Sequence, residues 1–430
     1  MDAPTAAEPG LTFRESPQNP AARIRDIADL CVKCGLCLPH CPTYRLVGIE
    51  GESPRGRISL IQGLVGEALT ASDRVVEHLE NCTGCLTCQS VCPAKVPYGE
   101  LIDLGRAQLR VRGRRRSTST RILGVLSRSR VVTGILLGLL RIARRLRVDR
   151  LALLFGIGPN HWLGRVLAHL HIPARNSAFR PTEIASAQPG DRQVMLFTGC
   201  VSRSLDPATL TDTTRVLERI GFRVNVPRAQ VCCGALDLHD GDPVTARNNA
   251  ARNSVAFGTL DQPIITVASG CAATLAEYAQ LAPVGGESLS GRLTSVEAFI
   301  EEYLSAEEQE LGTLDGRAVI FEPCTARNPR LRPSASRKLL ERVPGLDVVE
   351  LGTGLGCCGA SGHHFITRAG QADALAAPIV QEIAESTPDY VVVSNVGCAL
   401  HIGSLLSSWA DPPEVLHPIS LIARSLARRD

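Results

Sequence analysis

Residues 31–42 read Cys31-Val-Lys-Cys34-Gly-Leu-Cys37-Leu-Pro-His-Cys41-Pro42, and residues 82–93 repeat the pattern as Cys82-Thr-Gly-Cys85-Leu-Thr-Cys88-Gln-Ser-Val-Cys92-Pro93. Both stretches have the form C-x2-C-x2-C-x3-C-P, the run that holds [4Fe–4S] clusters in bacterial-type two-cluster proteins. Three thiolates spaced two residues apart can wrap one face of a compact cube, and the fourth lies beyond a longer gap. The sequence therefore predicts two [4Fe–4S] clusters.

The fourth cysteine of each motif is expected to bind the other cluster, as it does in two-cluster ferredoxins. The predicted ligands of the first cluster are Cys31, Cys34, Cys37 and Cys92. The predicted ligands of the second cluster are Cys82, Cys85, Cys88 and Cys41.

Two other uses of these cysteines are less favoured. A zinc ribbon also pairs C-x2-C units, but it needs four ligands per metal and has no use for a third cysteine or the following proline. Structural disulfides are disfavoured because three cysteines within seven residues have poor geometry for bridging.

Composition and length predict several domains in a reducing compartment. The chain has 430 residues, of which 44% are hydrophobic, enough for a sizeable core. All sixteen cysteines fall into repeated motifs, and residues 1–20 lack the apolar stretch of a signal peptide. We therefore expect a cytoplasmic protein. No run approaches the roughly 18 apolar residues of a spanning helix, so we do not expect the chain to cross a membrane.

The N-terminal part is predicted to be a small helical unit. Residues 1–20 are rich in proline and alanine and are expected to be disordered. Helices are expected over residues 21–30, 58–69, 75–79 and 98–110, flanking the two cysteine loops. These elements predict an α-helical ferredoxin-like domain with two clusters over residues 21–112.

Residues 113–187 are predicted to form a basic helical linker. Residues 106–150 hold fourteen arginines and one acidic residue, a net charge of +13, although the whole chain carries only +3. Apolar residues alternate with the arginines as in amphipathic helices. The segment is expected either to dock on an anionic membrane surface or partner subunit, or to pack on its own protein with its arginines in solvent. The pattern does not decide between these. Nucleic acid is disfavoured because no recognisable binding module accompanies the charge.

The C-terminal half is an internal repeat, predicted as one domain over residues 188–312 and a second over residues 313–430. Strands are expected over residues 193–200, 223–226 and 263–271 in the first copy, and over residues 317–324, 346–351 and 390–398 in the second. Helices are expected between them, so each copy is predicted to be an α/β unit with a mostly parallel sheet. The overall fold class is therefore α+β multidomain, and the two copies are expected to pack as a pseudo-twofold pair.

Each copy carries four cysteines near the carboxyl ends of its predicted strands, where open α/β sheets place their ligands. The first copy has Cys200, Cys232, Cys233 and Cys271, and the second has Cys324, Cys357, Cys358 and Cys398. Four thiols could hold a further metal centre, either an iron–sulfur cluster or zinc. A redox-active thiol pair and buried free cysteines remain open as alternatives.

The order of these parts resembles the iron–sulfur subunits of bacterial glycolate oxidases (glycolate dehydrogenases). The resemblance covers about residues 20–425. It rests on the two cysteine motifs, on Pro54-Arg-Gly-Arg57, on Cys232-Cys-Gly-Ala-Leu236 with Ala246-Arg-Asn-Asn249, and on Ala268-Ser-Gly-Cys271. The CCG repeat also resembles that of anaerobic glycerol-3-phosphate dehydrogenase subunits, lactate-utilisation proteins and heterodisulfide reductases.

The resemblance implies an electron-transfer subunit that is not catalytic on its own. It would accept electrons from FAD-containing partner subunits that oxidise glycolate to glyoxylate, and pass them through its clusters towards a quinone at the membrane. Peripheral attachment to the inner face of the cytoplasmic membrane would fit that role. Relays for D-lactate or glycerol 3-phosphate oxidation are the alternatives in the same class, and a thiol–disulfide catalyst like heterodisulfide reductase is the alternative in another.

One departure bears on that last alternative. Heterodisulfide reductase ends each repeat in C-x-x-C, which gives five cysteines for its cluster. Here Thr274 and His401 stand at the position of the fifth cysteine. The content of the two four-cysteine sites is therefore left open, with His401 as a less favoured extra ligand.

Overall fold

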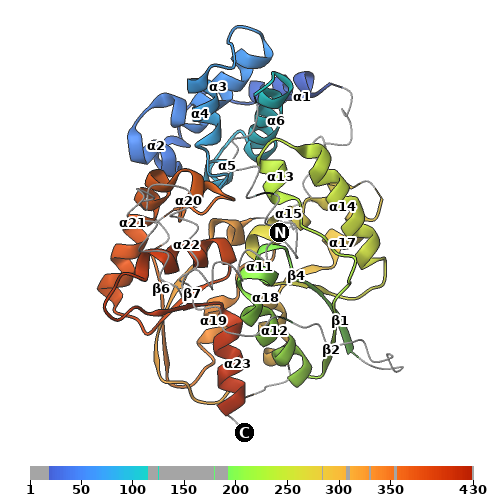
Figure 1. Ribbon diagram of the computed structural model, residues 1–430, viewed down its shortest axis with the longest axis vertical. Helices are drawn as coiled ribbons and strands as arrows, with labels where there is room; N and C mark the ends of the chain where they lie inside the picture. The colour runs from blue at the N-terminus through green and yellow to red at the C-terminus, as the bar shows by residue number, and fades with distance from the viewer. Residues whose placement is uncertain are drawn as a thin grey trace, which may run out of the picture.

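The computed structural model describes residues 19–114, 124, 179, 192–282, 284–306, 310–328, 331–352 and 356–428. The disorder expected over residues 1–20 lies outside the described residues except at Asn19 and Pro20, which instead cap and begin a helix. Nearly all of the helical linker expected over residues 113–187 also lies outside them. The described part forms a helical unit above two α/β units that stand side by side (Figure 1). None of the described helices is long and apolar enough to cross a membrane.

The helical unit contains the two cysteine loops. Its elements are α1 (Pro20–Asp29), η1 (Leu38–His40), α2 (Pro42–Val47), η2 (Glu50–Glu52), α3 (Pro54–Val65), α4 (Asp73–Glu80), α5 (Thr87–Ser90) and α6 (Tyr98–Val111). Local sequence fixes where the helices begin. The Asn19 side chain caps α1 and the Ser53 hydroxyl caps α3, and a proline occupies the first position of each helix. All four predicted helices are confirmed, with α3 beginning four residues earlier than expected.

The helices pack around one apolar core, to which α1, α3 and α6 contribute most. Ile24, Ile61, Leu64 and Leu101 are fully buried there. Burying each such side chain contributes about 1.5–3 kcal/mol. The same core includes several motif cysteines, so the cysteine loops are anchored to it.

The first α/β unit has a four-stranded parallel sheet in the order β2-β1-β3-β4. Its elements are β1 (Arg192–Phe197), α11 (Val201–Leu205), α12 (Pro207–Arg219), β2 (Phe222–Asn225), α13 (Ala235–His239), α14 (Pro243–Phe257), β3 (Ile264–Thr266), α15 (Ser269–Leu275), α16 (Tyr278–Leu281), α17 (Gly286–Gly291), β4 (Leu293–Ser295) and α18 (Val296–Ala306).

The second unit repeats this topology with the order β6-β5-β7-β8, also fully parallel. Its elements are β5 (Gly316–Phe321), η3 (Cys324–Arg327), α19 (Ser336–Leu340), β6 (Leu346–Glu350), α20 (His364–Thr367), α21 (Ala369–Ser386), β7 (Tyr390–Val393), α22 (Val396–Leu406), β8 (Glu414–Leu416) and α23 (Pro418–Arg428). The predicted α/β repeat and the mixed fold class are confirmed.

Four strand predictions were too long. The strands expected over residues 193–200 and 317–324 end at Phe197 and Phe321. The strands expected over residues 263–271 and 390–398 end at Thr266 and Val393, and Cys271 and Cys398 lie in the first turns of α15 and α22. The fourth strand of each sheet, β4 and β8, was not predicted. The boundaries at residues 112, 187 and 312 stay predictions.

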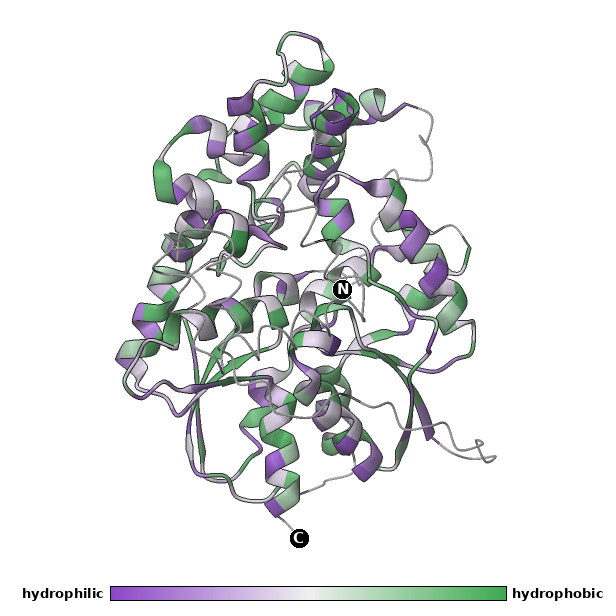
Figure 2. Cartoon of the chain, viewed as in Figure 1, coloured by the Kyte–Doolittle hydropathy of each residue, from purple (hydrophilic) through white to green (hydrophobic). Residues whose placement is uncertain are grey.

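The two copies share a hydrophobic core in addition to their own. Leu210 and Leu217 of α12 and Ile419 and Ile422 of α23 are fully buried in it, and α12 packs directly on α23. Figure 2 shows hydrophobic residues along the strands of both sheets and polar ones on the outer helices. This shared core brings the two sets of cysteines, at the carboxyl ends of the strands, toward the same end of the molecule.

Polar contacts complete the interface between the copies. The Ser269 N–H donates to the Ser394 carbonyl at 3.0 Å, and the hydroxyls of Ser269 and Thr325 are 2.7 Å apart. These residues lie close to Cys271 and Cys324 in sequence, so the two cysteine sets lie on either side of the interface.

Candidate iron–sulfur and thiol centres

The two cysteine loops have the same backbone shape. Lys33 and Gly84, at equivalent positions, have φ values of 58° and 61°, and Gly35 and Leu86, also equivalent, have 85° and 57°. A lysine and a leucine rarely adopt this left-handed conformation unless the surroundings impose it. Two loops of different sequence thus share left-handed conformations at matching positions, as expected of a backbone that wraps a common group. All sixteen cysteines are free thiols. The loops therefore fit the predicted clusters.

Cys41 lies near the second motif, and so does Cys37. Burial raises the pKa of the Cys88 thiol, and the thiols of Cys85, Cys82, Cys41 and Cys37 raise it further. For Cys37, burial also raises the pKa, and the contributing thiols are those of its own motif, Cys31 and Cys34. Thiols of both motifs therefore act on Cys88, and the crossed ligand sets stay a prediction.

In the first α/β copy the four cysteines come together. The Cys200 and Cys232 sulfurs are 3.5 Å apart. Hydrogen bonds to Cys232 and Cys271 raise the pKa of the Cys233 thiol, as does its burial. Gly199 has a φ of +64°, and a Cβ there would lie 3.5 Å from the Cys271 sulfur, so the loop passes close to this group.

The four cysteines of the second copy also come together. The Cys358 and Cys398 sulfurs are 2.8 Å apart. Cys357 accepts hydrogen bonds from Cys324 and Cys358, which hold the pKa of its thiol well below the ordinary value despite its burial. Cys357 is therefore the cysteine of this set that carries negative charge most readily.

The four-thiol sets have the donor chemistry of either a zinc site or an iron–sulfur cluster. A structural zinc binds four ligands on one ion, and a [4Fe–4S] cube binds each thiolate through a different iron. The content of the two sets stays a prediction, with both kinds of centre as alternatives.

The second cysteine loop lies directly against the second copy's thiols. The Thr83 hydroxyl donates a hydrogen bond to Cys357. Burial and the charge of Cys357 raise the pKa of the Cys85 thiol to about 12. The pKa of the Cys324 thiol is raised mainly by Cys357 and by burial, and to a smaller extent by Cys85. Arg368, at the start of α21, pairs with Glu80 at 2.8 Å and holds the two units together.

The first copy meets the helical unit differently. Arg106 and Arg110 of α6 donate to the backbone carbonyls of His239 and Asp240 at the end of α13. The thiols that contribute to the pKa shifts of Cys200 and Cys233 all belong to the first copy itself. The two copies, equivalent in sequence, are thus inequivalent in their contact with the cluster loops.

His401 is occupied by other partners. It is fully buried, with Nδ1 2.7 Å from the Cys358 carbonyl and Nε2 3.1 Å from Asp373. Both ring nitrogens therefore face oxygen atoms, which favours a structural role next to the cysteine loop over the extra-ligand alternative.

The first arginines of the basic segment pack on this chain itself. Arg106, Arg110, Arg112 and Arg114 each donate to backbone carbonyls, such as those of Cys82, Leu64 and Ala71. Arg106, Arg110 and Arg112 precede the linker predicted over residues 113–187, so these contacts do not decide between its two alternatives. The remaining ten arginines of residues 106–150 lie outside the described residues.

Sequence reasoning missed a buried charge pair beside Cys41, formed by Arg57 and Glu52. A signal was present. Arg57 precedes Ile61 and Leu64 by four and seven residues, so it lies on the apolar face of α3 rather than on its solvent face. Thr83 was also missed, since a threonine between two predicted ligand cysteines carries no special pattern.

Comparisons with known proteins agree with this architecture. The family model described as a 4Fe-4S dicluster domain matches residues 27–96, and the model described as a cysteine-rich domain matches residues 194–276 and 318–403. The matched residues are the two cysteine loops and the two α/β copies.

Similar curated proteins share most of the chain. The glycolate oxidase iron-sulfur subunit of Escherichia coli is 29% identical over 96% of this chain and 98% of its own length. The probable glycolate oxidase iron-sulfur subunit of Bacillus subtilis is 27% identical over 86% of this chain and 87% of its own. Lactate utilization protein A of Geobacillus kaustophilus is 27% identical over 52% of this chain and 96% of its own.

Proposed function

Because the chain belongs to the iron–sulfur electron-transfer proteins that join a 4Fe-4S dicluster domain to two cysteine-rich domains, we propose that its partner subunits oxidise glycolate to glyoxylate. The chain is a subunit of an oxidoreductase complex. The observation that supports its relay role best is the pair of similarly shaped cysteine loops anchored in one core, the second of which lies against a further thiol set. Glycolate as the substrate is favoured by the two relatives that match nearly the whole chain.

In this proposal the protein holds two [4Fe–4S] clusters, and the FAD belongs to partner subunits. Bound clusters supply one-electron carriers whose potentials depend on charge and hydrogen bonding around the sulfurs. The chain's own residues hold the thiolates in place, bury them, and set the local charge. The second thiol set, around Cys357, is proposed as a further centre because it abuts the Cys85 loop. A quinone is proposed as the final acceptor.

Metal analysis tests the number of centres. We expect about eight iron and eight sulfide per chain for the two predicted clusters, and about twelve of each if one cysteine-rich copy holds a third. Iron, acid-labile sulfide and zinc should be measured on anaerobically purified protein, with EPR of the reduced form. Zinc at one or more per chain without EPR signals would contradict the relay role.

Substrate identity can be tested on the assembled complex. Affinity-tagged chain should copurify with flavin-containing subunits, and adding glycolate should bleach the iron–sulfur absorbance and produce EPR signals. The second candidate, D-lactate, is favoured by the similarity to lactate utilization protein A, which extends over about half of this chain. Reduction by D-lactate or glycerol 3-phosphate and not by glycolate would overturn the proposed substrate.

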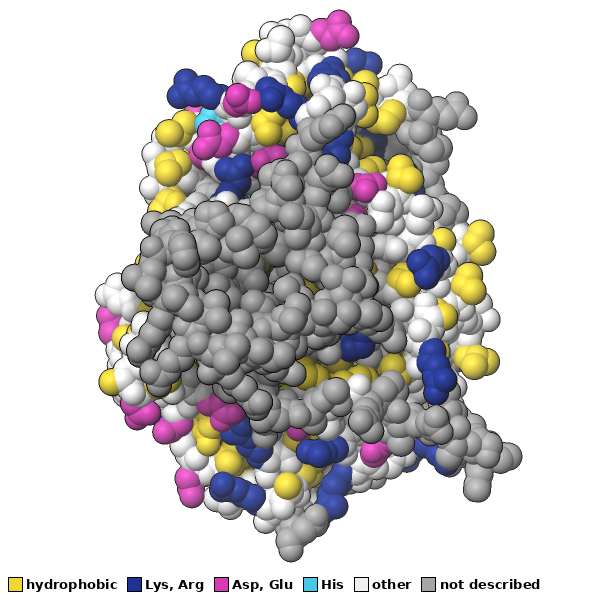
Figure 3. All heavy atoms as spheres, in the orientation of Figure 1, with side chains coloured by type: hydrophobic (Ala, Val, Ile, Leu, Met, Phe, Trp, Pro, Cys, Tyr) yellow, Lys and Arg dark blue, Asp and Glu magenta, His cyan; other side chains and the backbone are white. Residues whose placement is uncertain are grey.

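Peripheral membrane binding through the basic segment is a further part of the proposal. On the face shown in Figure 3, the basic side chains of described residues are scattered rather than gathered in one patch. We propose attachment through the arginines after Arg114, such as Arg141, Arg144, Arg145 and Arg147, because basic residues are concentrated there in the sequence. Each basic residue near an anionic surface contributes about 1 kcal/mol, so replacing these four by glutamine should weaken binding about a thousandfold.

Flotation with vesicles that contain anionic phosphatidylglycerol measures this. A matched control replaces four exposed arginines of the first cysteine-rich copy, namely Arg215, Arg219, Arg228 and Arg252. The control should still float with the vesicles. Equal flotation of both variants and the unmodified protein would instead favour a segment that packs on its own protein.

A further inference from the structure

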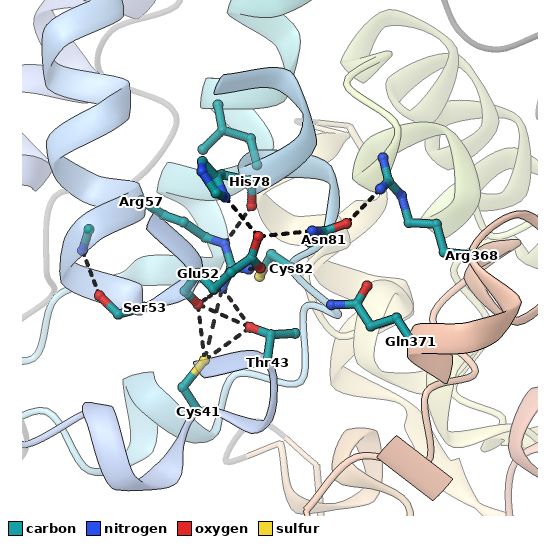
Figure 4. A network of polar contacts seen from close by, with 12 residues as sticks. Cys41, Thr43, Glu52, Ser53, Arg57, His78, Asn81, Cys82, Arg368 and Gln371 are labelled. Atoms are coloured by element: carbon teal, nitrogen blue, oxygen red, sulfur yellow. Dashed lines mark hydrogen bonds and ion pairs between the residues drawn. The ribbon is translucent and has the colours of Figure 1, made fainter. Parts of the chain in front are cut away.

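Arg57 is a buried cation next to the predicted ligands of the second cluster. It is only 1% exposed, although guanidinium groups are rarely buried without a functional or pairing reason. Its Nη1 lies 3.9 Å from the Cys41 sulfur and donates to the Thr43 hydroxyl at 3.0 Å (Figure 4). The Thr43 hydroxyl is itself 3.3 Å from the Cys41 sulfur. One side of the guanidinium is thus directed at a ligand cysteine.

The opposite side of the guanidinium is held by Glu52. Nη2 of Arg57 is 2.5 Å from a carboxylate oxygen of Glu52, which is 4% exposed. The other carboxylate oxygen is 2.8 Å from His78 Nδ1 and 2.8 Å from the Asn81 amide. The contacts of the carboxylate are therefore with Arg57, His78 and Asn81, on the side away from Cys41, as Figure 4 shows. The pair is oriented with its positive end toward the cysteines.

A second set of contacts fixes this orientation. Arg57 Nε donates to the His78 carbonyl at 2.7 Å, and Nη1 donates to the Glu52 carbonyl. The Asn81 oxygen accepts from Arg368 of the second cysteine-rich copy at 2.6 Å. These hydrogen bonds hold the guanidinium in one orientation. Through Asn81 the network reaches Arg368, at the interface with the second cysteine-rich copy.

The charge of Arg57 also acts on the predicted ligand cysteines. A guanidinium is not deprotonated in proteins, so Arg57 is charged. Its electrostatic partners include Cys82 and Cys41. The cation therefore interacts with cysteines from both motifs. This pair of cysteines is the one that the crossed assignment gives to a single cluster.

We propose that Arg57, oriented by Glu52, sets the reduction potential of the cluster that Cys41 and Cys82 would hold. This inference rests on the proposed relay function. Reduction adds negative charge to a cluster, so a cation fixed at its ligands in a low-dielectric interior favours the reduced state. Glu52 has two effects: it orients Arg57 and partly offsets its charge.

Two variants should shift this potential in opposite directions. Glu52→Gln keeps an acceptor for Arg57 but removes the offsetting charge, so the potential should rise. Arg57→Met removes the cation and leaves the carboxylate, so the potential should fall below that of the unmodified protein. Each shift should reach about tenfold in the equilibrium constant for reduction, which is about 59 mV for one electron. The other cluster should keep its potential in both variants.

The measurement is an EPR-monitored redox titration with dithionite and mediators on the full chain. Because the reductant is chemical, the outcome does not depend on which substrate the partners oxidise. Arg55→Gln is the matched control: Arg55 lies two residues away on the same helix, pairs with Glu50, and is partly exposed. It should leave the potential of the Cys41 cluster unchanged.

A structural role alone predicts a different result. Loss of packing would reduce cluster occupancy in both variants, without opposite shifts. If Arg57→Met does not fold, two other variants still test the proposal. The reduction potential should rise in Glu52→Gln and should not shift in Arg57→Lys, which keeps the charge. Equal shifts of both clusters, or no shift in Glu52→Gln, would overturn the proposal.

Discussion

Replacing Cys41 by serine should remove the cluster of the second motif, not that of its own. Cys41 is 6% exposed, and its sulfur contacts Thr43 and the Arg57 guanidinium, which also interacts with Cys82. Its thiol acts on the pKa of Cys88, which it helps to raise. Loss of one ligand should lower the iron content by about four atoms per chain. Iron analysis and EPR of the reduced protein measure this loss.

Double variants identify which cluster is lost. Cys41→Ser combined with Cys82→Ser should lose no more iron than either single change, because both cysteines would serve one cluster. Cys41→Ser combined with Cys31→Ser should lose about eight iron atoms, because each change would remove a different cluster. The complementary control pairs Cys92→Ser with Cys31→Ser, which should again lose only about four.

The reverse pattern would show that each motif holds its own cluster. In that case Cys41→Ser with Cys31→Ser would retain about half of the iron. The remaining EPR signal would then respond to changes at Cys85. Either result is clear because the double variants differ by about four iron atoms per chain.

The cysteine groups could be predicted well because their spacing is local. Three cysteines within seven residues determine a loop, and the repeat offset of 125 residues aligns Cys232 with Cys357 in the sequence alone. The two loops share left-handed positions at Lys33 and Gly84, where one copy has a glycine and the other does not. The shape thus follows from the cysteine pattern more than from the intervening residues.

Short strands and helix starts were harder to predict. β4 and β8 have three residues each, too few to show an alternating pattern, and they form because β3 and β7 present an open edge to them. Cys271 was placed at the end of a strand, but the chain leaves the sheet after Thr266 and Cys271 lies in the first turn of a helix. The end of a strand is hard to locate from an apolar run, because the first turn of a buried helix that follows can be as apolar as the strand.

Domain docking could not be predicted at all. Nothing in the one-dimensional pattern distinguishes Cys357 from Cys232, yet Thr83 donates a hydrogen bond to Cys357. The choice depends on complementary surfaces, such as the pairing of Arg368 with Glu80 and Asn81, whose members are 287 and 288 residues apart. Such contacts are settled by the packing of whole units.

Cys357→Ser should therefore alter the second-motif cluster, whereas Cys232→Ser should not. The low pKa of Cys357 makes it a buried negative charge beside Cys85, and that charge opposes the reduction of a cluster there. Removing it should raise the potential of that cluster, by about 59 mV for a tenfold change in the one-electron equilibrium. If the second copy holds a centre, the variant should also lose its iron and any magnetic broadening that this centre imposes on the neighbouring EPR signal.

Cys232→Ser is the matched control because it changes the equivalent cysteine of an equivalent fold. The thiols that act on Cys233 are all in the first copy, so the control should leave the potentials and line shapes of both motif clusters as they are. Thr83→Val gives an independent check: it removes the hydroxyl that donates to Cys357 without touching a ligand. If Thr83→Val and Cys357→Ser each shift the potential of the second-motif cluster and Cys232→Ser does not, the second copy would be next in the electron path. Equal effects of Cys232→Ser and Cys357→Ser would mean that the contact with the cluster loop does not select between the copies, and that the electrons leave by another route.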